Sequence, residues 1–255
     1  MKDRPLSFII LATLLCIALP VSATTDTFSN NYIPKITFSH FSTNEGLSQS
    51  TVVSSCQDKF GRMWFATHDG LNMFDGHRFT IYKNVQKDST SLINNIIRHV
   101  YCDNEGGIWI GTEKGLSYYD ITKDSFRNFP TQNRPVSGIA EAGDEELMIA
   151  AGGNILFFDT DSWTLKTDCH IGQLESVDAT ILYRQEDNIW IGTRQDGLFC
   201  YSISSKEFRR ISAFTSNRSI ECIIMTSPHS LWIATEGDGL YCLNTTTDTS
   251  VNYRH

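Results

Sequence analysis

Short polar turns follow five similar apolar segments in this 255-residue chain. They are "THDG" (67–70), "TEKG" (112–115), "AGGN" (151–154), "TRQDG" (193–197) and "TEGDG" (235–239). Such a mixture of side chains suits hydrogen bonding to sugar hydroxyls, and two cations among them suit the carboxylate of an acidic sugar. The candidate ligand-binding residues are His68, Asp69, Glu113, Lys114, Arg194, Gln195, Asp196, Glu236 and Asp238, with Lys114 and Arg194 as the anion partners. For any single residue, the competing interpretation is a solvated turn residue selected for loop geometry.

Catalysis is the second hypothesis for the same turns. A pair of carboxylates from different turns, for instance Asp69 with Glu236, could flank a glycosidic bond in a lyase or glycosidase. The sequence contains no His-Cys-Asp cluster with metal-ligand spacing and no "GxSxG" motif. We therefore expect no catalytic residue, no metal, no cofactor and no enzymatic activity.

A sequence repeat must position these turns. "MWFATHDGLNMFD" (63–75) returns as "IWIGTEKGLSYYD" (108–120), "IWIGTRQDGLFCYS" (189–202) and "LWIATEGDGLYCLN" (231–244), with a divergent copy, "LMIAAGGNILFFD" (147–159). The anchors Trp64, Trp109, Met148, Trp190 and Trp232 are 45, 39, 42 and 42 residues apart. A period of this length is typical of propeller blades.

Each unit is predicted to contain four short strands. An apolar run leads through an Asp-Gly turn to the Trp strand, a Gly-Leu turn leads to a third strand, and a fourth strand such as "RFTIYK" or "SFRNF" follows. The fold class is therefore all-β, a β-propeller of about five four-stranded antiparallel blades. The units span approximately residues 42–84, 87–129, 134–168, 172–212 and 215–255 of a repeat region at 24–255.

The repeated residues have structural roles. The anchors Trp64, Trp109, Trp190 and Trp232 are predicted to be apolar plugs between blades. Two residues later, on the same strand face, a small residue leaves room for the neighbouring blade: Ala66, Gly111, Ala150, Gly192 and Ala234. The alternative, an exposed Trp ladder that stacks sugars, conflicts with the apolar neighbours of these residues.

The six cysteines after residue 23 match no zinc spacing, and fifteen disulfide pairings are possible. We interpret each one as a buried small apolar residue instead of a bridge. Cys222 and Cys242 in particular are expected two strands apart in one blade, roughly 9.6 Å, beyond the ~7 Å Cα limit for a bridge.

The N-terminal segment predicts export. Lys2 and Arg4 precede an apolar run that ends in "VSA", so residues 1–23 are predicted to be a signal peptide cleaved after Ala23, with an uncleaved anchor as the alternative. Removing Lys2, Arg4 and Asp3 from 21 basic and 29 acidic residues leaves 19 and 28. That acidic balance argues against a nucleic-acid partner. We expect a periplasmic protein whose only membrane contact is the signal segment.

An incomplete ring is expected. The strand-like "KITFSHF" (35–41) could complete the last blade, but that blade already has its own fourth strand in "DTSVNYRH" (248–255). One of these outer strands therefore has no blade of this chain to complete, and we predict an open arc from a longer ring.

The segment 44–84 resembles the two-component-regulator propeller repeat. Gly46, Leu47, Ser48, Asp58, Gly61, Trp64, Thr67, Gly70, Leu71, Asp75, Gly76 and Phe79 carry the resemblance, which extends over residues 36–255 and is weakest in the third unit. It implies the periplasmic sensor region of a hybrid two-component sensor histidine kinase that recognises a glycan fragment as a dimer. We expect the kinase and DNA-binding parts implied by the family to be absent from these 255 residues. An envelope propeller that binds other proteins is the remaining alternative.

Overall fold

The computed structural model describes residues 37–166 and 177–254. The chain divides into two units, Met1–Ser39 and His40–His255. Residues 37–39 of the first unit contain no strand, and the predicted signal peptide lies outside the described residues. All described strands belong to the second unit, and no described helix is long and apolar enough to span a membrane.

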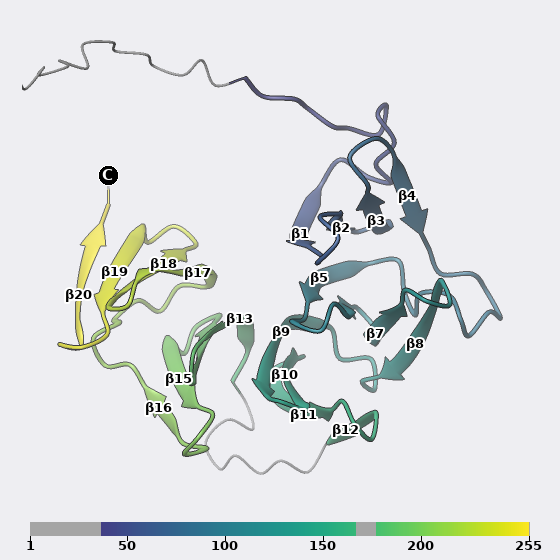
Figure 1. Cartoon of the computed structure of the whole chain (residues 1–255). Helices are drawn as coiled ribbons and strands as arrows, with labels where there is room; N and C mark the ends of the chain where they lie inside the picture. The colour runs from purple at the N-terminus through teal and green to yellow at the C-terminus, as the bar shows by residue number, and fades with distance from the viewer. Residues whose placement is uncertain (1–36, 167–176, 255) are drawn as a thin grey trace, which may run out of the picture. The chain divides into compact units, whose positions relative to one another are not determined.

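The described strands form five antiparallel sheets of four (Figure 1). The first contains β1 (Val52–Gln57), β2 (Met63–Thr67), β3 (Gly70–Phe74) and β4 (Phe79–Tyr82), and the second β5 (Ile97–Cys102), β6 (Ile108–Thr112), β7 (Gly115–Asp120) and β8 (Ser125–Pro130). The third contains β9 (Val136–Gly143), β10 (Glu146–Ala151), β11 (Asn154–Asp159) and β12 (Thr164–Lys166). The fourth contains β13 (Ala179–Gln185), β14 (Asn188–Thr193), β15 (Leu198–Ser202) and β16 (Phe208–Arg210), and the fifth β17 (Ile220–Ser227), β18 (Ser230–Thr235), β19 (Leu240–Asn244) and β20 (Thr249–Tyr253).

Strand order within every sheet follows the order along the chain. Each sheet is a simple meander, and the first strands of successive sheets pack on one another, β1 on β5, β5 on β9, β9 on β13 and β13 on β17. This is the arrangement of propeller blades. The predicted all-β propeller with five four-stranded blades is confirmed.

The Trp anchors, and the small residues two positions after them, pack at the interfaces between sheets. Trp64, Trp109 and Trp190 are almost fully buried, as is Met148 in the divergent third sheet. A Cβ added to Gly111 would lie 2.6 Å from the Val136 carbonyl oxygen of the next sheet. The small residue is therefore required because the neighbouring backbone occupies the space of a side chain, as predicted.

The fifth sheet differs because no sheet follows it in the described array. Its anchor, Trp232, is only partly buried and stacks on Tyr253 with ring centroids 5.5 Å apart. Ile224 and Val251 of the same sheet are more than half exposed. The sheets thus form an open array, which confirms the predicted incomplete ring.

Two expectations from the sequence are wrong. The "KITFSHF" segment forms no strand in its described residues, 37–41, and Phe41 instead packs against Phe74 and Phe79 at 5.1 and 5.6 Å. Cys56 and Cys102 form a disulfide between β1 and β5, with their Cα atoms 6.0 Å apart. The core-filling interpretation missed this bridge because it considered strand spacings within one sheet and not the packing between first strands.

Of the other described cysteines, only Cys200 is buried as expected; Cys222 is exposed and Cys242 is partly buried, although neither forms a bridge. Cys200 is buried in the core between the fourth and fifth sheets, and Cys222 and Cys242 are both free thiols, on β17 and β19 with β18 between them. Burial raises the pKa of the Cys200 thiol to about 11. Cys169 lies outside the described residues.

Candidate functional site

In the first two sheets, the indole N–H of the Trp anchor donates a hydrogen bond to a side chain in the turn between the first and second strands. In the first sheet the Trp64 indole Nε1 donates to the Asp58 carboxylate at 2.9 Å, and in the second Trp109 Nε1 donates to Asp103 at 2.8 Å. In both cases the acceptor precedes the Trp by six residues, in the turn between the first and second strands. This bond satisfies a buried donor and places the turn carboxylate at the end of the blade interface.

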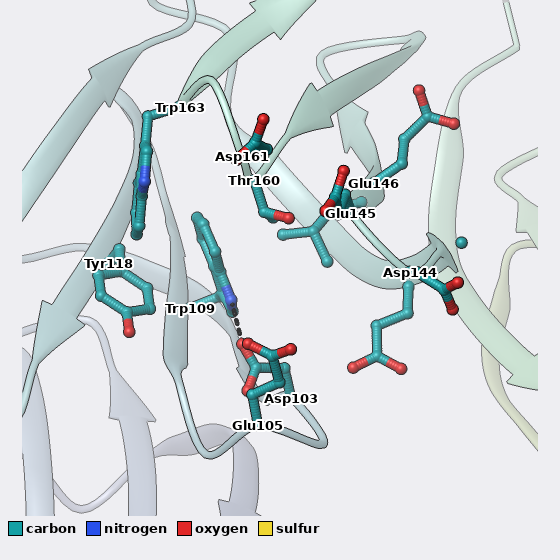
Figure 2. A pocket seen from close by; sticks show the side chains of 13 residues that line it. Asp103, Glu105, Trp109, Tyr118, Asp144, Glu145, Glu146, Thr160, Asp161 and Trp163 are labelled. Carbon is teal, nitrogen blue, oxygen red and sulfur yellow. Dashed lines mark hydrogen bonds between the residues drawn. The ribbon is translucent and has the colours of Figure 1, made fainter.

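A cleft lies at that end of the interface between the second and third sheets (Figure 2). Its volume is about 260 Å³. It is bounded by the β5–β6, β9–β10 and β11–β12 turns. The lining residues are Asp103, Glu105, Trp109, Tyr118, Glu141, Gly143, Asp144, Glu145, Glu146, Leu147, Thr160, Asp161 and Trp163. The cleft therefore combines aromatic rings with a high density of carboxylates.

Three aromatic rings form one wall of the cleft. Trp109 lies against Tyr118 with ring centroids 4.8 Å apart and stacks on Trp163 at 5.8 Å. Tyr118 meets Trp163 edge to face at 4.9 Å, and the Arg127 guanidinium lies over Trp163 at 4.5 Å. Burial raises the pKa of the Tyr118 hydroxyl, so it stays protonated and can donate a hydrogen bond at neutral pH.

Trp163 occupies an unusual backbone position. Its φ is +56°, in the left-handed region that bulky residues rarely adopt. The corresponding turns of the second, fourth and fifth sheets have Asp124, Lys206 and Asp248 there, with φ between +49° and +58°. The turn geometry thus demands this conformation in every one of these sheets, and the ring contacts of Trp163 must offset a cost of roughly 1–2 kcal/mol.

The carboxylates around the cleft fall into two groups. Asp103 accepts the Trp109 and Gly107 N–H groups, Glu141 pairs with Arg184 at 2.8 Å, and Glu146 pairs with Lys166 at 2.9 Å. The remaining four side chains have no hydrogen bond or ion pair with any residue in 37–166 and 177–254: Glu105, Asp144, Glu145 and Asp161. Within those ranges, no group of three or more His, Cys, Asp or Glu side chains could hold a metal ion.

The surplus negative charge determines which groups the cleft can accept. Carboxylate oxygens only accept hydrogen bonds, so they suit hydroxyl or N–H donors, and they repel an anionic ligand. An aromatic wall beside such acceptors suits a ligand that has an apolar face and many hydroxyl donors. The site can bind and orient such a molecule.

The predicted turns lie at the opposite end of the strands from the cleft. The turns between second and third strands lie beside the segments that lead into the first strands, as shown by backbone hydrogen bonds such as Gly70 N to Asn95 O at 2.8 Å and Glu236 N to Ser219 O at 2.9 Å. None of the nine predicted ligand-binding residues lines the cleft. The suggested carboxylate pair is divided between the first and fifth sheets.

Several of the predicted residues have partners on their own surface. Asp69 pairs with Lys83 at 2.7 Å, Glu113 with Arg98, Arg194 with Asp178 at 2.8 Å, and Asp238 with Arg254 at 2.5 Å. Exposed side chains at the same end of the strands are His68, Lys114, Gln195, Asp196 and Glu236. Their role in ligand binding stays a prediction.

Sequence reasoning did not find the cleft, although two signals were present. Four of the five tryptophans are repeat anchors, and Trp163 is the fifth. The run "GDEE" (143–146) concentrates carboxylates in one short turn. Both signals lie in the divergent third unit, where the repeat pattern is weakest.

Comparison with known proteins now connects this fold to a family. Residues 46–69 and 91–114 match the two component regulator propeller family. A segment of 55 residues is 54% identical to histidine kinase P4 of Formosa agariphila, which covers 22% of this chain and 4% of that protein.

Two solved structures from B. thetaiotaomicron are similar in fold. The extracellular domain of BT3049, described as a hybrid two component system, has a TM-score of 0.59 and 24% identity, over 85% of this chain and 36% of that one. The extracellular domain of BT4673, described as a one component system, has a TM-score of 0.64 and 20% identity, over 80% and 31%. The chain thus spans about a third of these structures and a small part of the curated kinase.

Proposed function

We propose that this chain is the ligand-sensing propeller region of an extracytoplasmic two-component sensor, and that its acidic cleft binds a neutral oligosaccharide. The observation that carries the proposal is the combination, in one cleft, of an aromatic wall with four carboxylates that have no cationic partner among the described residues.

The family match supports the sensor role, and the similar extracellular domains support a location outside the cytoplasm. Histidine kinase and DNA-binding functions belong, in this proposal, to parts outside these 255 residues. The chain itself is then a binding module without catalysis, and a dimer of such modules transmits the signal. An apolar sugar face would lie on the rings of the cleft wall, and the sugar hydroxyls would donate to the carboxylates.

The charge of the cleft refines the expected glycan class. Lys114 and Arg194 suit an acidic sugar, but they lie at the other end of the strands, and Arg194 is already paired with Asp178. A uronic acid in the cleft would face Glu105, Asp144 and the neighbouring carboxylates. Coulomb repulsion therefore favours a neutral oligosaccharide over an acidic one.

Isothermal titration calorimetry of the full chain tests this proposal. Neutral and acidic oligosaccharides of matched length are titrated into the wild type and into Trp163→Asn, because Asn tolerates a left-handed backbone and preserves the turn. Binding of a neutral oligosaccharide should weaken at least about tenfold, the equivalent of 1.4 kcal/mol, in Trp163→Asn. Asp248→Asn, at the corresponding turn position of the fifth sheet, is the matched control and should bind as the wild type does.

An additional variant tests at which end of the strands the ligand binds. Arg194→Gln lies among the predicted turns, away from the cleft. If Arg194→Gln abolishes binding and Trp163→Asn does not, the ligand site is at the predicted turns and the cleft assignment is wrong. If no neutral oligosaccharide binds the wild type, the proposed ligand class is wrong.

A further inference from the structure

One carboxylate that lines the cleft is engaged by residues of two other sheets. Glu141 Oε1 accepts the Asn104 backbone N–H at 3.0 Å, and Glu141 Oε2 accepts Asn104 Nδ2 at 2.6 Å. Oε2 also accepts Arg184 Nη1 at 2.8 Å, and the Glu141 side chain is only 13% exposed. A carboxylate offers about four acceptor positions, so little of this capacity is left for a ligand.

The three residues belong to successive sheets. Asn104 lies in the β5–β6 turn of the second sheet, Glu141 on β9 of the third and Arg184 on β13 of the fourth. Glu141 and Arg184 occupy equivalent positions, since each pairs with the residue before the anchor of its own sheet, Leu147 and Ile189 respectively. The first strands of these sheets pack on one another. The Glu141 carboxylate therefore links three neighbouring sheets at the end of the strands where the cleft lies.

The β5–β6 turn forms one boundary of the cleft. Asp103 and Glu105, the residues before and after Asn104, both line the cleft, and Asp103 accepts the Trp109 indole N–H (Figure 2). From the first sheet, Lys59 Nζ donates to the Glu105 carbonyl oxygen at 2.6 Å. The placement of this turn therefore decides where the Glu105 carboxylate lies and which acceptor the Trp109 ring meets.

Arg184 balances an unfavourable arrangement of charges. Glu141 shares the cleft with Glu105, Asp144 and other carboxylates that have no cationic partner in the described part of the chain. Like charges repel, and they do so more strongly in a partly buried site than in water. Within the described residues, the cation that pairs with Glu141 is Arg184. Without it, repulsion would drive the Glu141 carboxylate toward solvent and away from Asn104.

We propose that Glu141 is the positioning residue of the acidic cleft, and that Arg184, which does not line the cleft, controls its ligand affinity from the fourth sheet. Arg184 holds Glu141 in the orientation that binds Asn104, and Glu141 thereby fixes the β5–β6 turn against the third sheet. The inference rests on the proposed function, because it takes the cleft as the ligand site. Coupling between two sites is reciprocal, so ligand binding strengthens the contact between the third and fourth sheets by the factor that this contact adds to the affinity.

The first measurement needs no ligand. The full chain is labelled with ¹⁵N, and the Trp109 and Trp64 indole signals are assigned by their loss in Trp109→Phe and Trp64→Phe. Arg184→Gln should shift the Trp109 signal, because the acceptor Asp103 lies in the β5–β6 turn. The Trp64 signal should stay in place, because its acceptor belongs to the first sheet, and this also shows that the variant is folded.

Lys166→Gln is the matched control. Lys166 also pairs with a carboxylate that lines the cleft, Glu146 at 2.9 Å, but both residues belong to the third sheet. The variant loses the same charge and breaks no contact between sheets. The Trp109 signal should therefore stay in place.

The second measurement is calorimetric titration with a neutral oligosaccharide. Arg184→Gln should weaken the affinity at least about tenfold, and Lys166→Gln should weaken it less. In a Glu141→Gln background, Arg184→Gln should cause no further loss, because an amide at position 141 already places N–H donors against those of Asn104 and Arg184.

The positioning role is wrong if Arg184→Gln leaves the Trp109 signal in place, or if Lys166→Gln shifts that signal equally. Additive effects of Glu141→Gln and Arg184→Gln on the affinity would also overturn the proposal. If the wild type binds no neutral oligosaccharide, the proposed function and the control of affinity fail together. The ligand-free shift of the Trp109 signal then still decides whether Glu141 positions the turn.

Discussion

Removing the Asp58 carboxylate should destabilise the fold more than its position in a surface turn suggests. Asp58 is 5% exposed, and its side chain accepts four hydrogen bonds, from the Phe60 and Arg62 backbone N–H groups, Arg62 Nε and Trp64 Nε1, at 2.7–3.0 Å. Burial alone would raise the pKa of Asp58, but these hydrogen bonds outweigh it and lower the pKa below its ordinary value. Asp58 is therefore ionised at neutral pH.

The size of the effect follows from the partners. Asp58→Ala leaves the fully buried Trp64 indole N–H without an acceptor, at a cost of roughly 1–3 kcal/mol, and removes the two backbone bonds, for roughly 1 kcal/mol more. We expect the free energy of unfolding to fall by about 3 kcal/mol in total. Urea denaturation followed by circular dichroism measures this change, provided that the variants share one m-value.

A double-mutant cycle isolates the indole bond. Trp64→Phe removes the N–H but retains an aromatic plug, so Asp58→Ala should cost about 1–2 kcal/mol less in that background. Asp75→Ala is the control, because Asp75 also accepts two backbone N–H groups, of His77 and Arg78, but no buried indole. A coupling energy below about 0.5 kcal/mol, or an Asp75→Ala variant as unstable as Asp58→Ala, would refute the argument.

Three other outcomes are expected. Lowering the pH from about 6.5 to 4 should destabilise the fold. Burial lowers the pKa of His99 to about 4, whereas in the unfolded chain His99 takes up its proton near the ordinary histidine pKa. His99→Gln should therefore flatten this part of the curve of unfolding free energy against pH. Reducing the Cys56–Cys102 disulfide, which closes a separation of 46 residues, should lower the free energy of unfolding by about 4 kcal/mol, measured by urea denaturation with and without reductant and contradicted by identical midpoints. Trp64→Ala should cost about 3–5 kcal/mol and Trp232→Ala at least about 1 kcal/mol less, because Trp232 is only partly buried; equal losses of stability would contradict the open array.

The blade architecture could be predicted because its determinants are local and repeated. Each copy of the pattern specifies a Trp strand, a Gly-Leu turn and a third strand, and these elements pair in chain order. The requirement for a small residue at Gly111 also follows from strand periodicity, and the Val136 carbonyl oxygen near its missing Cβ confirms it. Five copies of one pattern make the assignment of elements much more certain than a single copy would.

The cleft could not be predicted because it lies between units and depends on features that the repeat does not share. Trp163 and Glu145 belong to turns of the divergent third sheet, while Trp109 belongs to the second. Their proximity results from the packing of two sheets, and a search for polar residues in the recurring turns led to the other end of the strands. The Cys56–Cys102 bridge was missed for the same reason. Its two cysteines lie on β1 and β5, which belong to different sheets and come together only when the sheets pack.

The strands, their order within each sheet and the buried anchors follow from local sequence patterns, because hydrophobic periodicity and turn chemistry act over a few residues. The packing of the sheets is needed to establish which turns meet across an interface, which carboxylates lack cationic partners and which buried indole lacks an acceptor. The first two properties depend on side chains that belong to neighbouring units of the repeat, about forty residues apart along the chain, and the third depends on how the indole is oriented at the folded interface. Trp190 illustrates the difference: the sequence identifies it as a plug, and the folded interface reveals its unpaired N–H.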